Sequence, residues 1–313
     1  MTALSHPIDM AIEPLNTDVS EDILAAPAAH AQVQIQEQAH VEVPAPAAPK
    51  QSLKPLFKKW TLLVLPPILG ILMFLGVWAL IAANSPNLPG PVKTWASAVQ
   101  LFSDPFYQKG PNDQGIGWNI LASLKRVGIG FGMAAVLGIP LGFLIGRVAF
   151  FNGMLSPIIS LLRPVSPLAW LPIGLLVFKA ANPAAIWVIF ISAIWPLIIN
   201  TAVGVSRVPQ DYLNVARVLD LSPWKVMHKI LLPATLPYIL TGIRLSIGVA
   251  WLVIVAAEML TGGVGLGFWV WDEWNNLNVE HIIIAIFVVG IVGLLLEQLL
   301  VFIARKFSYE YQA

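Results

Sequence analysis

The sequence predicts an all-α polytopic membrane protein with six transmembrane helices. Its 313 residues are 57% hydrophobic and only 11% charged, whereas a soluble globular protein carries roughly 25% charged residues. Several apolar runs also reach the roughly 20 residues that a helix needs to cross a bilayer core of about 30 Å. The chain has no cysteine and its net charge is +1. Disulfides and thiolate metal sites are therefore excluded, and nothing indicates nucleic acid binding.

Residues 1–52 are expected to form a disordered cytoplasmic tail, and residues 53–313 the membrane domain. The first 49 residues hold seven acidic side chains and no Lys or Arg, and Ala, Pro and Gln fill most of the remainder. Such a segment buries too little apolar surface to offset the entropy of ordering its chain. It has neither a basic start nor an early apolar core, so it does not resemble a signal peptide. A solvated tail is the main interpretation, and a partner-binding or regulatory arm is the alternative.

Each predicted span is an apolar run bounded by polar or turn-forming segments. The first, residues 62–83, follows three lysines that place its start in the cytoplasm. Residues 84–117 are rich in turn formers and are predicted as an external loop with one short interfacial helix over residues 92–102. The remaining spans are predicted at residues 119–146, 156–178, 183–204, 236–260 and 281–304.

The distribution of basic residues predicts that both termini are cytoplasmic. With six spans and a cytoplasmic start, the inside segments hold eleven Lys and Arg residues and the outside loops hold three. This asymmetry agrees with the positive-inside rule, which the opposite orientation would violate.

Small residues and prolines shape the second and third spans. Gly138, Gly142 and Gly146 recur at every fourth residue, which puts them on one helix face and lets a neighbouring backbone approach closely. Pro140 lies within the same span, and three more prolines lie in the third. Kinked, closely packed helices are typical of a bundle whose segments move against each other, although ordinary packing explains the same residues.

Ionisable side chains within the spans are candidates for a transport pathway. A charge at mid-bilayer costs about 2.5–3.5 kcal/mol on insertion scales, so these residues should face the bundle interior, a partner or the interface. Four cations against two acids favour the passage of an anion, while snorkelling or structural pairing is the alternative. Arg163 is expected near the cytoplasmic edge, and Glu258 is expected to be a gate residue or a helix-end contact. The candidate pathway residues are Arg126, Arg163, Arg244 and Glu258.

A polar, basic segment separates the fourth and fifth spans, and residues 207–235 are called the polar loop below. A first short helix is expected to end near Ser222–Pro223, because the residue before a proline is disfavoured in a helix. A second short helix is expected to begin at Pro223, which suits a first helical turn. Two short helices at a bend would form a compact cytoplasmic docking surface. A plain loop that lies on lipid headgroups is the alternative.

The glycine-rich segment TGGVGLG, residues 261–267, does not indicate a nucleotide site. No strand is predicted before it, its spacing is not GxGxxG, and the topology places it outside. The P-loop pattern GxxxxGK[ST] is absent from the sequence. The segment is interpreted as a tight external turn. No plausible Ser/His/Asp or Cys/His set occurs, so no catalytic site is predicted.

The spacing of the polar loop resembles the EAA motif of bacterial ATP-binding-cassette importer permeases. That motif begins with EAA, which is followed by three residues, a Gly, nine further residues and then Ile-x-Leu-Pro. This chain matches the spacing without gaps. Asn214 stands at the Glu and Asp220 at the Gly, and both depart from the pattern. A Gly there suits a turn between two short helices, which Asp adopts more readily than most residues. The coupling residues implied by the resemblance are Asn214, Val215, Ala216, Asp220, Ile230, Leu232 and Pro233.

Residues 161–178 and 239–260 resemble one branch of these permeases, which includes those for taurine, alkanesulfonate, nitrate, cyanate and bicarbonate. Lys179 stands where this branch usually has Gly. The resemblance covers about residues 60–305, and NVARVLDLS is most similar to the cyanobacterial nitrate/nitrite permeases and their bicarbonate relatives. It implies a type I importer permease fold (MetI-like) and import of a small oxyanion, nitrate or nitrite, by alternating access. Bicarbonate, cyanate and an alkanesulfonate or taurine are alternative substrates.

The resemblance also implies which molecules work with the chain. The chain itself would be no enzyme and hold no cofactor, because ATP and Mg would bind to partner subunits. Those partners would be a second permease copy in a homodimer, two cytoplasmic ATP-binding cassette subunits, a periplasmic or lipid-anchored solute-binding protein and membrane lipid. The expected location is the bacterial inner (plasma) membrane. A stand-alone secondary transporter or channel, and an integral membrane enzyme or scaffold, are the alternative classes.

Overall fold

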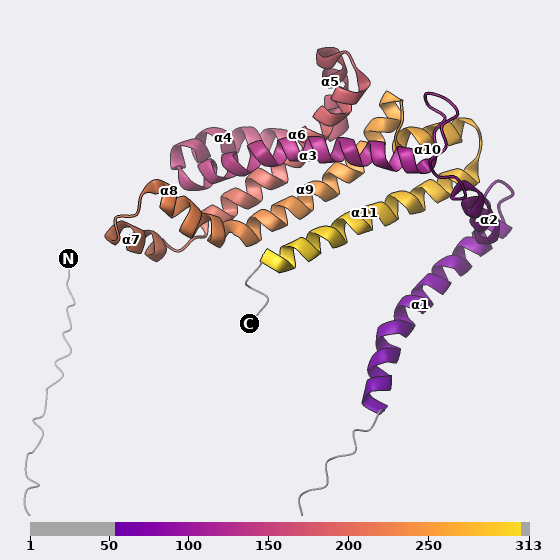
Figure 1. The fold of residues 1–313 in the computed structure, drawn as a ribbon, viewed down its shortest axis with the longest axis horizontal. Helices are drawn as coiled ribbons and strands as arrows, with labels where there is room; N and C mark the ends of the chain where they lie inside the picture. The colour runs from indigo at the N-terminus through magenta and orange to yellow at the C-terminus, as the bar shows by residue number, and fades with distance from the viewer. Residues whose placement is uncertain (1–53, 308–313) are drawn as a thin grey trace, which may run out of the picture. The chain divides into compact units, whose positions relative to one another are not determined.

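A computed structural model describes residues 54–307, and the packing discussed below lies within the compact unit that begins at Lys59 (Figure 1). The tail expected at residues 1–52 lies outside the described residues. Apart from an isolated bridge between Gln108 and Gln114, residues 54–307 contain helices, turns and irregular segments but no strand.

The helices follow one another with short connections. In chain order they are α1 (Lys54–Ala83), α2 (Pro91–Leu101), α3 (Ile116–Arg147), α4 (Ala149–Leu162), the 3-10 helix η1 (Pro167–Trp170), α5 (Leu171–Phe178), α6 (Ala181–Ser206), α7 (Gln210–Val218), α8 (Pro223–Val226), the π-helix η2 (Met227–Leu231), α9 (Leu232–Thr261), α10 (Leu266–Asn275) and α11 (Val279–Phe307). Within the described residues, five helical segments are long and apolar enough to cross a membrane, and a bent pair forms a sixth, broken span. The predicted all-helical membrane fold is confirmed.

Helices α3, α6 and α9 supply most of the buried core. α3 and α6 run in the same direction in a constant register, with Gly130 against Ile189 and Gly146 against Val205. α9 runs in the opposite direction to α6. In Figure 1, α7 and α8 lie at one end of this helix group, and α10 lies at the other.

The small-residue face of α3 is the surface that contacts α6. A Cβ atom on Gly142 would lie 2.5 Å from Thr201 Cβ and 2.8 Å from the Ile198 carbonyl oxygen, both well inside van der Waals contact. Gly146 is equally close to the backbone of α6. On another face of α3, a Cβ on Gly132 would meet no atom within 4 Å. The close approach predicted from the glycine spacing is therefore confirmed.

The prediction of a single third span over residues 156–178 is wrong. α4 ends at Leu162, and the following segment, Pro167–Phe178, is bent by 97° relative to it. Pro164 and Pro167 explain the break, because each lacks an N–H group and disfavours helical geometry in the residue before it. Irregular backbone at membrane depth is tolerated where it packs against protein or lines a cavity.

The fifth span begins earlier than residue 236. α8, η2 and α9 form one continuous helical segment, Pro223–Thr261, so the second short helix predicted for the polar loop is the first part of this span. Pro233 is the second residue after the π-helix. A proline ring clashes with the carbonyl group four residues earlier in a regular α-helix, and the wider π-turn relieves that clash.

The helix α10 was missed by the sequence analysis. The glycine-rich turn predicted after α9 is present, with Gly262 and Gly263 at φ values of 76° and 92°. Leu266–Asn275 then forms a helix of ten residues, although its sequence lacks an amphipathic pattern. The short helix predicted at residues 92–102 is confirmed as α2, and its interfacial position stays a prediction.

Helices α1, α2 and α11 contact one another at the end of the bundle that carries α10. The rings of Phe74 and Trp78 in α1 lie 6.3 and 5.8 Å from that of Phe287 in α11. Lys93 in α2 forms an ion pair with Glu280 in α11. From Val64 onward, most apolar side chains of α1 are exposed, as suits a helix surrounded by lipid or by another subunit.

We predict that Gly142→Ala lowers the free energy of unfolding by about 1–3 kcal/mol, because the added methyl group overpacks the α3–α6 contact. The matched control is Gly132→Ala on the same helix, where the added methyl group meets open space. This substitution should not lower stability, because alanine is a better helix former than the flexible glycine. SDS titration of the purified protein measures both. Equal stability of the two variants would contradict the close approach.

Candidate functional site

The polar loop is anchored to the bundle by one side of α7. Leu213 is buried in a cluster with Phe143 of α3, Val205 of α6 and Ile239 of α9. Ala216, one turn further along α7, is also buried. Leu213 and Ala216 thus anchor α7 to the helix bundle.

Asp220 ends α7 in a left-handed turn. Its φ angle is 47°, and the N–H groups of Asp220 and Leu221 donate to the carbonyl oxygens of Arg217 (3.1 Å) and Ala216 (3.0 Å). These two bonds are those of a Schellman motif, in which glycine is the preferred left-handed residue. The motif ends the helix at Val218, several residues before the predicted end near Ser222. The expected turn between two helices is thus present, with Asp in place of Gly.

The opposite side of α7 presents apolar side chains to the exterior. Tyr212, Val215, Val218 and Leu219 are all exposed, and their spacing places them along one stripe of the helix. These four residues are called the apolar stripe below. Trp224, just beyond the turn, is exposed as well. Such a stripe at i, i+3 and i+7 is typical of a helix that inserts into a groove of a partner.

The other residues implied by the EAA resemblance take different positions. Asn214 is exposed on α7, and Ile230 is half-buried in η2. Leu232 and Pro233 are exposed at the start of α9. Their coupling role stays a prediction.

A buried ion pair lies at the opposite end of the bundle. Glu258 Oε1 in α9 lies 2.6 Å from Arg126 Nη1 in α3. The side chain of Glu258 is 1% exposed and that of Arg126 is 14% exposed. Ser123 Oγ also donates to the carboxylate, at 2.8 Å from Oε2. Arg126 donates further to the Val264 carbonyl oxygen (2.7 Å) and to Asn182 Oδ1 of α6 (2.6 Å). The pair therefore joins three span helices.

The same carboxylate holds the N-terminus of α10. The Gly267 N–H donates to Glu258 Oε2 at 3.0 Å, and the Leu266 N–H donates to Ser123 Oγ at 3.0 Å. These are free donors of a first helical turn, and the negative charge also suits a helix N-terminus. A Cβ on Gly265 would collide with the Glu258 carboxylate. The glycines of this turn thus permit α10 to reach Glu258.

Sequence reasoning named Arg126 and Glu258 but missed their neutral partners. Asn119, Ser123 and Arg126 fall at i, i+4 and i+7, which is one face of a helix. This periodic polar face within an apolar span is the signal that identifies them. The hydrogen bond from the Gly265 N–H to Asn119 Oδ1 (2.8 Å) completes the network. Of the two alternatives for Glu258, the geometry matches a helix-end contact, and its role in a pathway stays a prediction.

Arg244 occupies a different environment. It forms an ion pair with Glu297 of α11, and the two side chains are 54% and 49% exposed. Both line a groove of about 600 Å³ between α9 and α11. The geometry matches the alternative of structural pairing for Arg244, and its role in a pathway stays a prediction.

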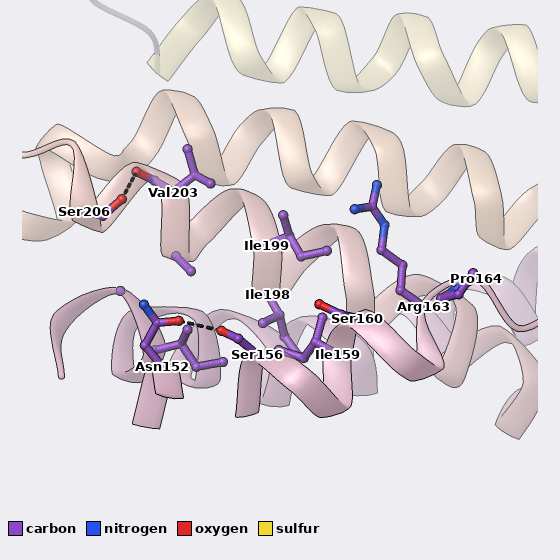
Figure 2. A pocket seen from close by; sticks show the side chains of 13 residues that line it. Asn152, Ser156, Ile159, Ser160, Arg163, Pro164, Ile198, Ile199, Val203 and Ser206 are labelled. Atoms are coloured by element: carbon purple, nitrogen blue, oxygen red, sulfur yellow. Dashed lines mark hydrogen bonds between the residues drawn. The ribbon is translucent and has the colours of Figure 1, made fainter. Parts of the chain in front are cut away.

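Arg163 lies at the break between α4 and η1, where two cavities meet. One cavity of about 670 Å³ lies among α3, α4 and α6, and the other, of about 430 Å³, lies among the break, α6 and α9. Arg163, Pro164 and Ile199 line both. Figure 2 shows Asn152, Ser156 and Ser160 along α4, leading to the extended side chain of Arg163.

Arg163 lies further along its span than the sequence predicted, and its expected position near the cytoplasmic edge stays a prediction. Ile199 and Trp195, which line a cavity with Arg163, belong to the middle of α6. The reason is that α4 begins seven residues before the predicted span, at Ala149 rather than at residue 156. Arg163 is therefore level with the central part of the bundle.

The cavities among α3, α4, α6 and α9 are lined by apolar side chains together with hydroxyl and amide groups. Within residues 54–307, no group of three or more His, Cys, Asp or Glu residues is placed to hold a metal ion.

Comparison with known proteins gives a consistent result. Residues 138–309 match the sequence profile of binding-protein-dependent transport system inner membrane components. The chain is 52% identical to the nitrate import permease protein NrtB of Leptolyngbya laminosa over 77% of this chain and 87% of that protein. It is 49% identical to NrtB of Synechocystis sp. over 82% of this chain and 93% of that protein. The chain is also 48% identical to the bicarbonate transport system permease protein CmpB of Synechocystis sp., over 75% of this chain and 85% of that protein.

A solved structure has a similar fold. A chain of the MetNI methionine ABC transporter, in an inward-facing conformation, aligns with a TM-score of 0.53 and 17% sequence identity. The alignment covers 61% of this chain and 94% of that chain. At this identity the similarity concerns the fold alone, and it agrees with the predicted MetI-like arrangement.

We predict a strong energetic coupling between Arg126 and Glu258. A double-mutant cycle with Arg126→Gln and Glu258→Gln should give a coupling energy of about 1–3 kcal/mol, because each single variant leaves a buried partner unpaired. The matched control is the exposed pair, with Arg244→Gln and Glu297→Gln, whose coupling should be below about 1 kcal/mol. SDS unfolding of the purified variants provides the four free energies. A weaker coupling in the buried pair than in the exposed one would contradict the network.

We predict that Asp220→Gly raises the free energy of unfolding by about 0.5–1 kcal/mol, because glycine adopts the left-handed conformation without a steric cost. Asp211→Gly, in the first turn of the same helix, is the control and should lower stability, since it removes a helix-compatible residue and a favourable charge. Thermal unfolding of both variants tests this. A loss of stability in Asp220→Gly equal to that of the control would contradict the assigned turn.

Proposed function

Because the chain belongs to the family of binding-protein-dependent transport system inner membrane components, we propose that it is the membrane subunit of an ATP-driven importer for a small oxyanion, with nitrate or nitrite as substrate. The observation that carries the proposal is the two-sided helix α7, which is anchored to the bundle by Leu213 and presents an apolar stripe outward. A stand-alone channel or secondary transporter has no need of such a surface.

The substrate follows from the relatives. Two nitrate import permeases are about as similar to this chain as the bicarbonate permease, at 52%, 49% and 48% identity. Nitrate and bicarbonate share one chemistry, that of a small planar anion with oxygen atoms at its corners. The nitrate assignment rests on the higher identity, and bicarbonate is the second candidate because of the CmpB similarity.

The polar loop couples the import cycle to ATP hydrolysis on partner subunits. The apolar stripe inserts into a groove of an ATP-binding cassette subunit, which binds ATP and Mg. When two such subunits close, α7 moves and displaces α3, α6 and α9 through the Leu213 cluster. The continuous segment Pro223–Thr261 carries this displacement along its length to Glu258. The ion pair with Arg126 then keeps α3, α9 and α10 together as they tilt.

Several features of the complex belong to the same proposal. Two copies of the chain form a homodimer, a solute-binding protein delivers the anion to the face that carries α10, and both termini lie in the cytoplasm. The chain itself performs no catalysis. The multi-pass location in an inner membrane agrees with the family and with the apolar helices.

We predict ATP-dependent uptake of labelled nitrate by proteoliposomes that contain the complete complex, with ATP and the solute-binding protein on the appropriate sides. Unlabelled nitrate and nitrite should compete, whereas cyanate and taurine should compete less. Competition by bicarbonate alone would assign the chain to the second candidate. Uptake by the isolated chain without the ATPase subunits would overturn the importer proposal.

The coupling step is tested in the same assay with Val218→Lys. Val218 is 85% exposed, so the substitution leaves the packing intact while it places a charge within the apolar stripe. Uptake should fall at least about tenfold, which corresponds to about 1.4 kcal/mol of lost interaction. Val218→Ala is the control, because it alters the same 85% exposed position but leaves the stripe uncharged. Equal uptake by the two variants would exclude docking through this stripe.

A further inference from the structure

Arg163 differs from Arg126 and Arg244 because it has no counter-ion among the described residues. Arg126 pairs with Glu258 and Arg244 pairs with Glu297. Among residues 54–307, no side chain forms a hydrogen bond or an ion pair with the Arg163 guanidinium. An unpaired charge at membrane depth is costly, so its presence indicates a partner that this subunit does not supply.

The surroundings of Arg163 suit an anion. No acidic residue lines either of the two cavities that meet at this residue. Together they extend along α6 from Ile191 to Ser206, a distance of about 22 Å in a helix. This length is a large part of the roughly 30 Å bilayer core. A cation placed within such a passage, without a neighbouring acid, attracts anions and repels cations.

Two serines lie close to Arg163 in the sequence. Ser160 and Ser166 each lie three residues from Arg163. Ser160 lines the first cavity and Ser166 the second. Neither hydroxyl group forms a hydrogen bond within the described part of the chain, whereas Ser192 and Ser206 donate to backbone carbonyl groups. The two free hydroxyl groups are thus available as donors on both sides of the break.

From this arrangement we infer that Arg163, with Ser160 and Ser166, forms an intramembrane binding site for a small planar oxyanion, which the substrate occupies during its passage. The inference rests on the proposed oxyanion import and adds the residues that hold the anion within the membrane. A guanidinium group donates two parallel hydrogen bonds to two oxygen atoms of a planar anion. The hydroxyl groups supply further donors without a charge, so the anion binds but is also released.

The lining of the second cavity favours a free anion over a lipid phosphate as the partner of Arg163. Its neighbours in the second cavity, Ser192 and Trp195, lie in the middle of α6, far from the polar ends of the helix where headgroups lie. Lys125, by contrast, lies in the third turn of α3, close enough to its end for a long side chain to reach the interface. The free anion and an acidic residue of a second copy are the sources that an experiment must separate.

The absence of cysteine from the chain provides a direct test that does not depend on transport. Ser160→Cys introduces a thiol that is alone in this chain, beside Arg163. In the purified complex, we measure the ratio of the modification rate by the anionic sulfonatoethyl methanethiosulfonate to that by the cationic trimethylammonioethyl reagent. Adding Arg163→Gln should lower this ratio at least about tenfold. Nitrate should slow the modification at matched ionic strength, and sodium gluconate should not.

Ser206→Cys is the matched control for the thiol experiment. It lines the same cavity at the end that carries the polar loop, so Arg163→Gln should leave its preference between the two reagents unchanged. An unchanged preference at Ser160→Cys after Arg163→Gln would overturn the site. Absence of protection by nitrate would also overturn it, and would assign Arg163 to a structural contact with a second copy.

Uptake by the complete complex distinguishes this inference from the proposed function. Arg163→Gln should raise the KM for nitrate at least about tenfold, and Arg163→Lys should restore only part of the loss, because lysine keeps the charge but not the paired donors. Lys125→Gln is the control cation and should transport normally. If the unaltered complex imports no oxyanion, the proposed function fails. If it imports nitrate and Arg163→Gln does so with an unchanged KM, only the Arg163 site fails.

Discussion

The close contact between α3 and α6 is the constraint on which the rest of the structure depends. Lipid tails are as apolar as leucine, so helices in a membrane associate through tight packing and hydrogen bonds rather than through the hydrophobic effect. Gly130, Gly142 and Gly146 allow this packing along the length of the pair. The same register brings Arg126 to Asn182 at one end and Phe143 to Val205 at the other. The ion-pair network and the anchored polar loop thus both follow from one helix contact.

Charge has two distinct uses within this framework. Glu258 and Arg126 satisfy each other and the first turn of α10, so their charges hold the helices together at that end. Arg163 lies at a break in the backbone, with cavities on both sides and no counter-ion among the described residues. Residue type alone does not separate a structural arginine from one that is available to a ligand. The difference lies in the neighbours that the fold supplies.

Two departures from the family pattern share one physical explanation. Lys179 and Asp220 stand where the related permeases usually have glycine, and both adopt positive φ angles, of 52° and 47°. The backbone geometry that glycine serves is therefore retained while the side chain is changed. Asp220 carries a smaller cost than most residues, because Asp adopts this conformation more readily. These positions end α5 and α7, so they fix where each helix stops.

The sequence by itself determined the class of the protein, the places of its long apolar helices, the glycine face of α3 and the spacing of the polar loop. Each of these depends on local properties, namely the length of apolar runs, the helical period and the residues at turns. Only the tertiary structure decided that the third span is broken beside Arg163, that α8 continues into α9, and that Asn119 and Ser123 join Glu258 in holding α10. These features depend on contacts between residues far apart in the chain, such as Ser123 and Glu258, which periodicity within one helix does not encode.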